Sequence, residues 1–284
     1  MSKKRLDESW KGWLKENLDR KCNPEELLGI LLKAEFSVDS IRECMGDKFP
    51  VHSDLLIGTE IQKQELDYQA LSTIRLTRPD SGVNAMKFMT GKLQLYIVDD
   101  FLSEKECDDI VQIINASLRP STVTIESNDK YFRTSRTSDL SVLGNPVVEA
   151  LDEKIARTIG IRLAYSEGIQ AQRYEIGQQF KQHTDFFEPG TDEHAKFGGE
   201  RGNRTWTFMV YLNTVAKGGG TKFFAIDKTF QPQKGRAVVW NNLYPDGTVN
   251  RDTLHAGLPV EEGHKIIITK WFREKGGGPM FYDT

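Results

Sequence analysis

The sequence lacks the features that mark secreted, membrane-spanning or disulfide-stabilised proteins. Its 284 residues include only three cysteines, Cys22, Cys44 and Cys107, at spacings typical of neither a disulfide framework nor a metal site. No apolar run approaches the roughly 20 residues that a membrane span requires. The first residues are basic, but no apolar segment follows them, so we expect no signal peptide. These absences predict a cytoplasmic protein with reduced thiols and no membrane partner.

Neither sign of charge dominates the chain. The formal net charge is -3 and the isoelectric point is near 6.0, whereas a nucleic-acid-binding surface needs clustered basic residues. We therefore expect no nucleic-acid partner. The hydrophobic fraction of 38% and the charged fraction of 28% are ordinary for a globular protein, and the length suits a catalytic domain with a smaller module.

Residues 1–68 have the pattern of a small helical N-terminal module. Apolar residues recur at helical spacing from Leu6 to Leu18, and Asn23-Pro24 predicts the start of a second helix. Ser37 should cap a third helix that Gly46 ends. A helix-turn-helix that reads DNA is disfavoured because the third helix offers only Arg42 as a basic residue. A packing or protein-contact module is the better prediction.

Residues 69–91 are predicted to connect this module to the catalytic domain, residues 92–284. Pro79, Gly82 and Gly91 interrupt the pattern there, and a helix is expected around residues 60–71. In the catalytic domain, the capping box Ser103-Glu104-Lys105-Glu106 predicts one helix. Asn145-Pro146 should begin another, which ends at Gly160.

From residue 169 onward the chain is rich in short strands separated by glycine and proline. This arrangement favours an antiparallel sandwich or barrel with helices before it, an α+β fold. The predicted strands are Ile169–Glu175, Gln182–Phe187, Thr205–Asn213, Thr221–Phe224, Gly235–Asn241 and Lys265–Phe272.

A candidate metal site begins at His183-Thr184-Asp185. Residues two apart on an extended strand point to the same face, so His183 and Asp185 can present an imidazole and a carboxylate together. His255, on a later strand, can complete a set of two histidines and one carboxylate, which is typical of non-haem Fe(II) oxygenases. Each of these histidines alone has an ordinary structural alternative, and a zinc hydrolase can use the same ligands.

Lys265 begins a predicted strand whose two faces are both largely apolar. It shares one face with Ile267, Thr269 and Trp271. A buried lysine is costly unless it meets a negative charge, and a bound dicarboxylate would supply one. The alternative is a lysine at a strand end whose amine reaches solvent.

Between about Leu93 and Phe272 the chain resembles the prolyl 4-hydroxylase family. Several motifs carry the resemblance in the family's order, and Asp100-Phe101-Leu102-Ser103 and Arg133-Thr134-Ser135 precede them. The main motifs are Arg173-Tyr174-Glu175-Ile176-Gly177, His183-Thr184-Asp185-Phe186-Phe187, Arg204 to Leu212, Gly218-Gly219-Gly220-Thr221-Lys222-Phe223, Leu243 to Gly247, Thr253-Leu254-His255-Ala256-Gly257, and Gly263-His264-Lys265 continuing to Trp271.

The resemblance implies a double-stranded β-helix (jelly-roll) core with flanking helices, and an Fe(II)- and 2-oxoglutarate-dependent oxygenase. With O2, and with ascorbate as a candidate reductant, such an enzyme hydroxylates a proline and releases succinate and CO2. His183, Asp185 and His255 would bind iron. Lys265, Tyr174 and Thr221 would bind the distal carboxylate of 2-oxoglutarate, with Trp271 packed beside the cosubstrate.

On the substrate side, the resemblance places Arg204 near a proline-containing peptide or protein. Residues 127–140, with Tyr131, Arg133 and Arg136, would form a flap, and residues 187–203 a second lid. Trp206 and Phe224 depart from the family pattern, and Trp206 is expected to narrow the cleft. A free amino acid or small metabolite as substrate, or a non-catalytic jelly-roll scaffold, are the alternatives. The carboxylate of Asp185 disfavours a halogenase, which needs that position vacant.

Overall fold

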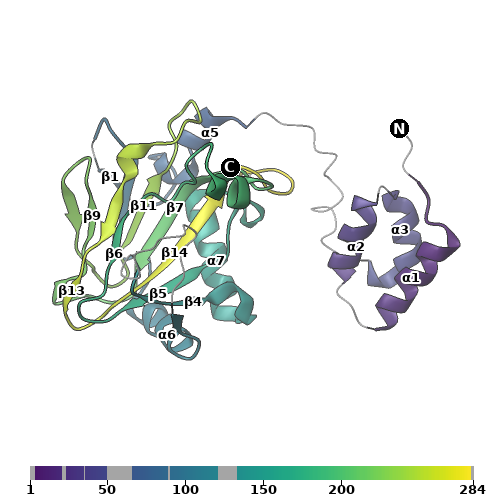
Figure 1. The fold of residues 1–284 in the computed structure, drawn as a ribbon, viewed down its shortest axis with the longest axis horizontal. Helices are drawn as coiled ribbons and strands as arrows, with labels where there is room; N and C mark the ends of the chain where they lie inside the picture. Colours follow the sequence, from purple (N-terminus) through teal and green to yellow (C-terminus); the bar gives the residue numbers. More distant parts are fainter. Residues whose placement is uncertain are drawn as a thin grey trace. The chain divides into compact units, whose positions relative to one another are not determined.

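The computed structural model describes residues 4–20, 24–34, 36–49, 66–88, 90–120 and 133–282 (Figure 1). The chain divides into two compact units, Met1–Glu65 and Leu66–Thr284. Among the described helices, none is both long enough and apolar enough to cross a membrane.

The first unit is a bundle of short helices around a small apolar core. The side chains of Asp7 and Ser37 accept backbone N–H groups at the starts of the first and third helices. The predicted cap Asn23 lies outside the described residues. Leu14, Leu28 and Ile41, one from each helix, are fully buried together. The elements are α1 (Glu8–Asp19), α2 (Pro24–Lys33), α3 (Val38–Met45) and the short turn η1 (Gly46–Lys48).

The segment predicted as a connector differs in the structure, because most of it is part of the second unit. Residues 69–91 contribute most of α5 (Tyr68–Ser72), the turn η2 (Arg75–Thr77) and β1 (Ala85–Phe88), which pairs with β2 (Leu95–Val98). Three apolar side chains, Leu71, Ile74 and Leu76, are buried in the main core. Their run is too short to give a periodic signal, which is why the sequence pattern looked irregular.

Two amphipathic helices cover one face of the large sheet, as Figure 1 shows. The predicted capping box is confirmed at α6 (Glu104–Asn115), where Ser103 and Glu106 bond each other's backbone N–H. The second predicted helix is α7 (Pro146–Ile159), with Asn145 as its N-cap and Gly160 in a left-handed conformation as its C-cap.

The described strands form antiparallel sheets, so the predicted mixed helix and antiparallel-sheet class is confirmed. The eight-stranded sheet has the order β1-β2-β11-β7-β14-β5-β4-β3, the four-stranded sheet has the order β10-β9-β12-β6, and β13 pairs with β8. The remaining elements are β3 (Arg119–Pro120), β4 (Arg136–Asp139), β5 (Gln170–Tyr174), β6 (Phe180–His183), β7 (Arg204–Tyr211), β8 (Lys217–Gly218), β9 (Thr221–Phe223), β10 (Lys228–Phe230), β11 (Ala237–Asn241), β12 (His255–Gly257), β13 (Val260–Glu262) and β14 (Lys265–Arg273), with the short turns η3 (Leu140–Leu143), η4 (Leu163–Tyr165), η5 (His194–Gly198) and η6 (Arg251–Thr253).

The large sheet is buried on both faces, and strand alternation divides its side chains between two cores. On β7, Phe208 and Val210 pack toward the helices, in the core that also holds Ile110 of α6. Met209 and Tyr211 point the other way and pack with Phe223 of the smaller sheet. The functional pocket lies on this second side, between the two sheets.

Candidate metal centre and its pocket

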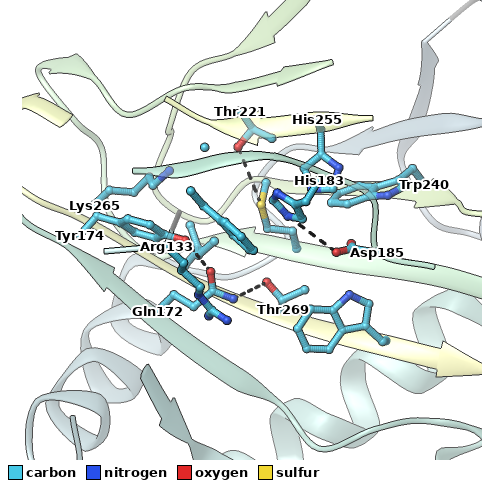
Figure 2. Close-up of a pocket in the computed structure, with 15 residues that line it drawn as sticks. Arg133, Gln172, Tyr174, His183, Asp185, Thr221, Trp240, His255, Lys265 and Thr269 are labelled. Atoms are coloured by element: carbon cyan, nitrogen blue, oxygen red, sulfur yellow. Dashed lines mark hydrogen bonds and ion pairs between the residues drawn. The ribbon is translucent and has the colours of Figure 1, made fainter. Parts of the chain in front are cut away.

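The three predicted metal ligands come together at the end of β6, a strand of the smaller sheet (Figure 2). His183, the last residue of β6, is the register partner of His255, the first residue of β12, and the centres of their rings are 4.3 Å apart. Asp185 was expected on the same strand as His183, but β6 ends at His183 and Asp185 lies in the bend that follows. Its Oδ1 is nevertheless 3.9 Å from Nε2 of His183. One potential ligand atom from each residue lies within 4.8 Å of the other two.

Both histidines are oriented for metal binding by their own backbones. Nδ1 of His183 lies 2.7 Å from the carbonyl oxygen of Lys181, and Nδ1 of His255 lies 2.9 Å from that of Thr253. A carbonyl oxygen only accepts, so each Nδ1 carries a proton and Nε2 is the ring nitrogen left to face a metal. Burial, and next the proximity of His255, lower the pKa of His183 to about 3, so its imidazole is neutral near pH 7.

Asp185 completes the set as an anion. Burial alone would raise the pKa of this carboxyl, but His255, His183, Arg204 and a hydrogen bond from Thr207 together lower it. The hydroxyl of Thr207 is 2.7 Å from Oδ2 of Asp185. Two imidazoles and one carboxylate suit a divalent transition metal such as Fe(II) and leave coordination positions open.

Lys265 supplies the pocket with a buried cation. It is 1% exposed, it is the register partner of Tyr174 on β5, and none of the described carboxylates forms an ion pair with it. Burial lowers the pKa of Lys265 to about 7. A Cβ atom added at Gly257 would lie 3.2 Å from Nζ, so the glycine leaves space beside the amine. A buried lysine without an anionic partner fits a site for an acidic ligand.

The other predicted cosubstrate residues line the same pocket as Lys265 and the metal ligands. The hydroxyl of Tyr174 donates to Oε1 of Gln172 at 2.7 Å. The hydroxyl of Tyr211 lies 2.7 Å from Oγ1 of Thr221 and 3.1 Å from the carbonyl oxygen of Phe230, and Oγ1 of Thr221 lies 3.9 Å from the sulfur of Met209. Trp271 lines the pocket as well.

Several residues that line the pocket were given no role by the sequence analysis. Phe180 stacks on the ring of His183 with 3.6 Å between ring centres, and the guanidinium of Arg133 lies 5.0 Å from the centre of the Phe180 ring. Strand alternation from Tyr174 identifies Gln172. The lining residues given no site role from the sequence are Gln172, Phe180, Met209, Trp240, Gly257, Ile267 and Thr269.

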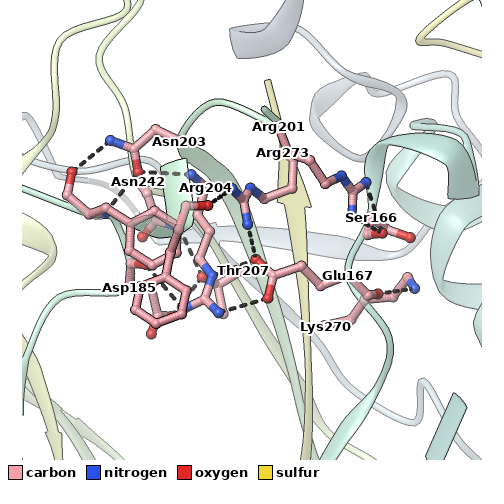
Figure 3. Close-up of polar contacts among 12 residues, drawn as sticks. Ser166, Glu167, Asp185, Arg201, Asn203, Arg204, Thr207, Asn242, Lys270 and Arg273 are labelled. Carbon is pink, nitrogen blue, oxygen red and sulfur yellow. Dashed lines mark hydrogen bonds and ion pairs between the residues drawn. The ribbon is translucent and has the colours of Figure 1, made fainter. Parts of the chain in front are cut away.

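Arg204 is held at the edge of the site by a network of charges (Figure 3). Its guanidinium donates two hydrogen bonds, both 2.7 Å, to the carboxylate of Glu167. It also lies 4.0 Å from the centre of the Trp271 ring and donates to the backbone carbonyl of Asp185 at 3.4 Å. Glu167 accepts a further bond from Arg273 at 2.9 Å. Arg204 is therefore fixed beside Trp271 and the metal-binding loop.

The other residues predicted to contact substrate are not all brought together. The expectation for Trp206 is wrong, because it faces the helices, is fully buried and donates its indole N–H to the carbonyl of Leu71 at 2.9 Å. Arg136 is exposed and donates to the carbonyl of Leu118, outside the pocket lining. Arg133 does line the pocket, and Tyr131 lies outside the described residues.

The two predicted lids have different outcomes. Residues 127–132 of the flap lie outside the described residues, and the part from Arg136 to Asp139 is strand β4, paired with β5. The second predicted lid, residues 187–203, has its two ends joined by hydrogen bonds. The side-chain amide of Asn203 bonds both the N–H and the carbonyl of Phe187, each at 2.8 Å. Its movement over the pocket stays a prediction.

Comparison with known proteins agrees with this geometry. Residues 169–273 match the model of the 2OG-Fe(II) oxygenase superfamily. The chain is 32% identical to probable prolyl 4-hydroxylase 4 of Arabidopsis thaliana, covering 66% of this chain and 69% of that protein. It is also 32% identical to prolyl 4-hydroxylase subunit alpha-1 of Gallus gallus, covering 62% of this chain but only 35% of the subunit. The chain thus spans about a third of the length of that animal relative.

A solved structure shares the fold of the second unit. The viral collagen prolyl hydroxylase of Paramecium Bursaria Chlorella virus-1, in its 2OG complex, is 26% identical, with a TM-score of 0.51 over 63% of this chain and 95% of that one. The shared fold, the placement of the three candidate metal ligands and the sequence identity all indicate the same family. The chain therefore belongs to the prolyl 4-hydroxylase family of 2OG-Fe(II) oxygenases.

Proposed function

We propose that this protein hydroxylates a proline residue in a peptide or protein substrate, using Fe(II), 2-oxoglutarate and O2, and releases succinate and CO2. One observation carries the proposal: Lys265, which is buried and forms no ion pair with a described carboxylate, lines the same pocket as the triad His183, Asp185 and His255. A zinc hydrolase with this triad would leave Lys265 without a task. The relatives from Gallus gallus and Arabidopsis thaliana described above bear the names of prolyl 4-hydroxylases.

We further propose that the second unit is a double-stranded β-helix. Two antiparallel sheets with an apolar core between them support it. The pocket lies between the sheets, where rigid strands position His183 and His255.

The residues that line the pocket would have distinct roles in the reaction. His183, Asp185 and His255 would hold Fe(II), which supplies the redox chemistry that activates O2 for insertion into a C–H bond. Lys265 would pair with the distal carboxylate of 2-oxoglutarate, and the hydroxyl groups of Thr221 and Tyr174 would donate to it. The apolar walls exclude water and strengthen these contacts.

The substrate would enter beside Arg204. Its guanidinium is already oriented by Glu167 and stacked on Trp271, so little conformational freedom is lost when it bonds a peptide carbonyl. An extended or polyproline-II segment would suit this edge of the pocket. Arg133, which lines the pocket and lies over Phe180, would contribute a second guanidinium.

A spectroscopic titration tests the metal and cosubstrate assignment. Anaerobic addition of Fe(II) and 2-oxoglutarate should produce a weak visible charge-transfer band in the wild type and none in His183→Ala. Absence of the band in the wild type would overturn the iron assignment. A non-catalytic scaffold predicts no conversion of 2-oxoglutarate to succinate, even without substrate.

A second assay tests the substrate class. Proline-rich peptides should stimulate succinate release and gain one oxygen atom by mass spectrometry, and Asp185→Ala should abolish both. Stimulation by free proline or another small metabolite alone would favour the small-molecule alternative.

We propose three further properties of the protein. The free thiols of Cys44 and Cys107 suit the cytoplasm. Ascorbate is proposed as a reductant that restores activity after turnover without substrate. The helical unit Met1–Glu65 is proposed to bind a protein. Cellular localisation checks the first property, and the dependence of activity on ascorbate checks the second. Co-purification of partners with the protein, with and without residues Met1–Glu65, checks the third.

A further inference from the structure

The least supported of the three ligands is Asp185. His183 and His255 lie in paired strands, and each is also held by its Nδ1 hydrogen bond. Asp185 lies beyond the end of β6, in a bend, so no strand ladder fixes its carboxylate. Something outside the smaller sheet must orient it.

One buried residue of the large sheet contacts this carboxylate, and a second buried residue contacts the first (Figure 3). Thr207 of β7 lies 2.7 Å from Oδ2 of Asp185, and Nδ2 of Asn242, just after β11, lies 2.9 Å from Oγ1 of Thr207. Thr207 and Asn242 are both 0% exposed. Thr207 is also flanked by Trp240 of β11 and Trp271 of β14, its register partners, so its side chain has little room to turn.

The direction of these hydrogen bonds is determined by the charge on Asp185. An ionised carboxylate can only accept, so the single hydroxyl proton of Thr207 must point to Oδ2. Thr207 then has only lone pairs for Asn242, which must therefore present its amide N–H rather than its oxygen. The chain of donors runs from Asn242 to Thr207 to Asp185.

We propose that Thr207 and Asn242 are positioning residues that make Asp185 a ligand through one oxygen. With Oδ2 bonded to Thr207, only Oδ1, the atom nearer His183, faces the centre. A carboxylate that bound through both oxygens would occupy a further position, which a two-oxygen cosubstrate needs. This inference deepens the proposed function and depends on it.

Metal affinity tests the proposal without turnover. We expect Thr207→Val to weaken Mn(II) binding about 10- to 100-fold, the usual effect of losing a partner that orients a ligand, and Thr207→Ser to retain wild-type affinity. Thr205→Val is the matched control. Thr205 lies on the same strand and is equally buried, but its hydroxyl has no partner in the described part of the chain. The d–d spectrum of the Co(II)-loaded protein should change in Thr207→Val alone.

A double-mutant cycle tests whether Asn242 acts through Thr207. Asn242→Leu should weaken Mn(II) binding in the wild type and have little further effect in Thr207→Val. Melting temperatures, with Thr207→Ala as a second variant, show whether each protein is folded. Wild-type affinity in Thr207→Val or Thr207→Ala, or an equal loss in Thr205→Val, would overturn the proposal. Failure of the wild type to bind Mn(II) or Fe(II) would instead overturn the proposed function, and the positioning role with it.

Discussion

The amine of Lys265 lies 4.4 Å from the centre of the Tyr174 ring, and no described carboxylate forms an ion pair with it. The ring is a weak partner for a charge compared with a carboxylate. The charged form of Lys265 therefore has no strong anionic partner among the described residues, and the carboxylate of a bound acidic cosubstrate would provide one.

Replacing this amine should separate cosubstrate binding from metal binding. We expect Lys265→Met to weaken 2-oxoglutarate binding about 100-fold, the value of a strong charge-assisted hydrogen bond, with Mn(II) affinity unchanged. Lys270→Met is the matched control. Lys270 lies on the same strand and is as deeply buried, but it faces the helices and is paired with Asp152 at 2.5 Å. Titration of the Mn(II)-loaded proteins by calorimetry measures both affinities, and an equal effect of the two variants would contradict the assignment.

Cosubstrate affinity should depend on pH in a definite direction. Burial lowers the pKa of free Lys265 to about 7, and a bound dicarboxylate would raise it again. Above pH 7 the free amine is largely neutral, so binding must take up a proton, and affinity should fall by about tenfold per pH unit. Below pH 7 the amine is already charged and affinity should level off. Calorimetry in buffers with different ionisation enthalpies counts the protons, and Lys265→Met should show no uptake by this group.

Local signals predicted the helices and most strands, but not which side of a strand faces the site. The caps at Ser103 and Asn145 depend on neighbouring residues only, so both were visible in the sequence. The sequence also showed that successive side chains of β7 alternate between the two faces of the sheet. Because both faces of the large sheet are buried, hydrophobicity could not show that Trp206 faces the helices while Thr207 faces the metal site. That choice depends on tertiary packing.

The metal ligands were predictable because few side-chain types bind Fe(II) and because His183 and Asp185 lie two positions apart, whereas the residues that support them were not predictable. The roles of Thr207 and Asn242 depend on contacts between residues that are far apart in the chain, 35 positions for this pair and 22 for Thr207 and Asp185. Polar residues inside a strand have no local signature of this kind. The same holds for Glu167, whose partners Arg204 and Arg273 are 37 and 106 positions away.

Trp206 should behave as a core residue. Trp206→Phe removes buried volume and the hydrogen bond to Leu71, and we expect it to lower the free energy of unfolding by about 2 kcal/mol. The KM for a proline-containing peptide should stay unchanged. Thermal unfolding and steady-state assays measure the two quantities. A raised KM with normal stability would return Trp206 to the cleft.

Glu167 should make the protein sensitive to acid. Burial alone would raise the pKa of this carboxyl, but Arg204 and Arg273 outweigh it and lower the pKa. Its stabilising contribution is therefore complete above its ordinary pKa, about 4.5, and is lost as pH falls through the lower folded value. Glu167→Gln should cost about 3 kcal/mol near pH 7, because two buried guanidinium groups lose their partner, and its stability should fall less steeply in acid.

An exposed ion pair provides the comparison for Glu167. Glu188 pairs with Arg251 at the surface, and Glu188→Gln should change the free energy of unfolding by less than about 1 kcal/mol. Urea denaturation between about pH 3 and pH 7 measures both variants. Parallel stability curves for wild type and Glu167→Gln would show that the buried pairs do not carry the acid response.

Gly257 tests how closely the pocket fits its cosubstrate. An added Cβ would lie 3.2 Å from Nζ of Lys265 and 3.7 Å from Cβ of Phe180. The amine must therefore move by a few tenths of an ångström, away from the position that a carboxylate would meet. We expect Gly257→Ala to weaken 2-oxoglutarate binding about tenfold and to leave Mn(II) affinity intact, since His255 keeps its strand pairing. Weaker Mn(II) binding in this variant would instead show that the methyl group displaces β12, and the effect could then not be assigned to Lys265.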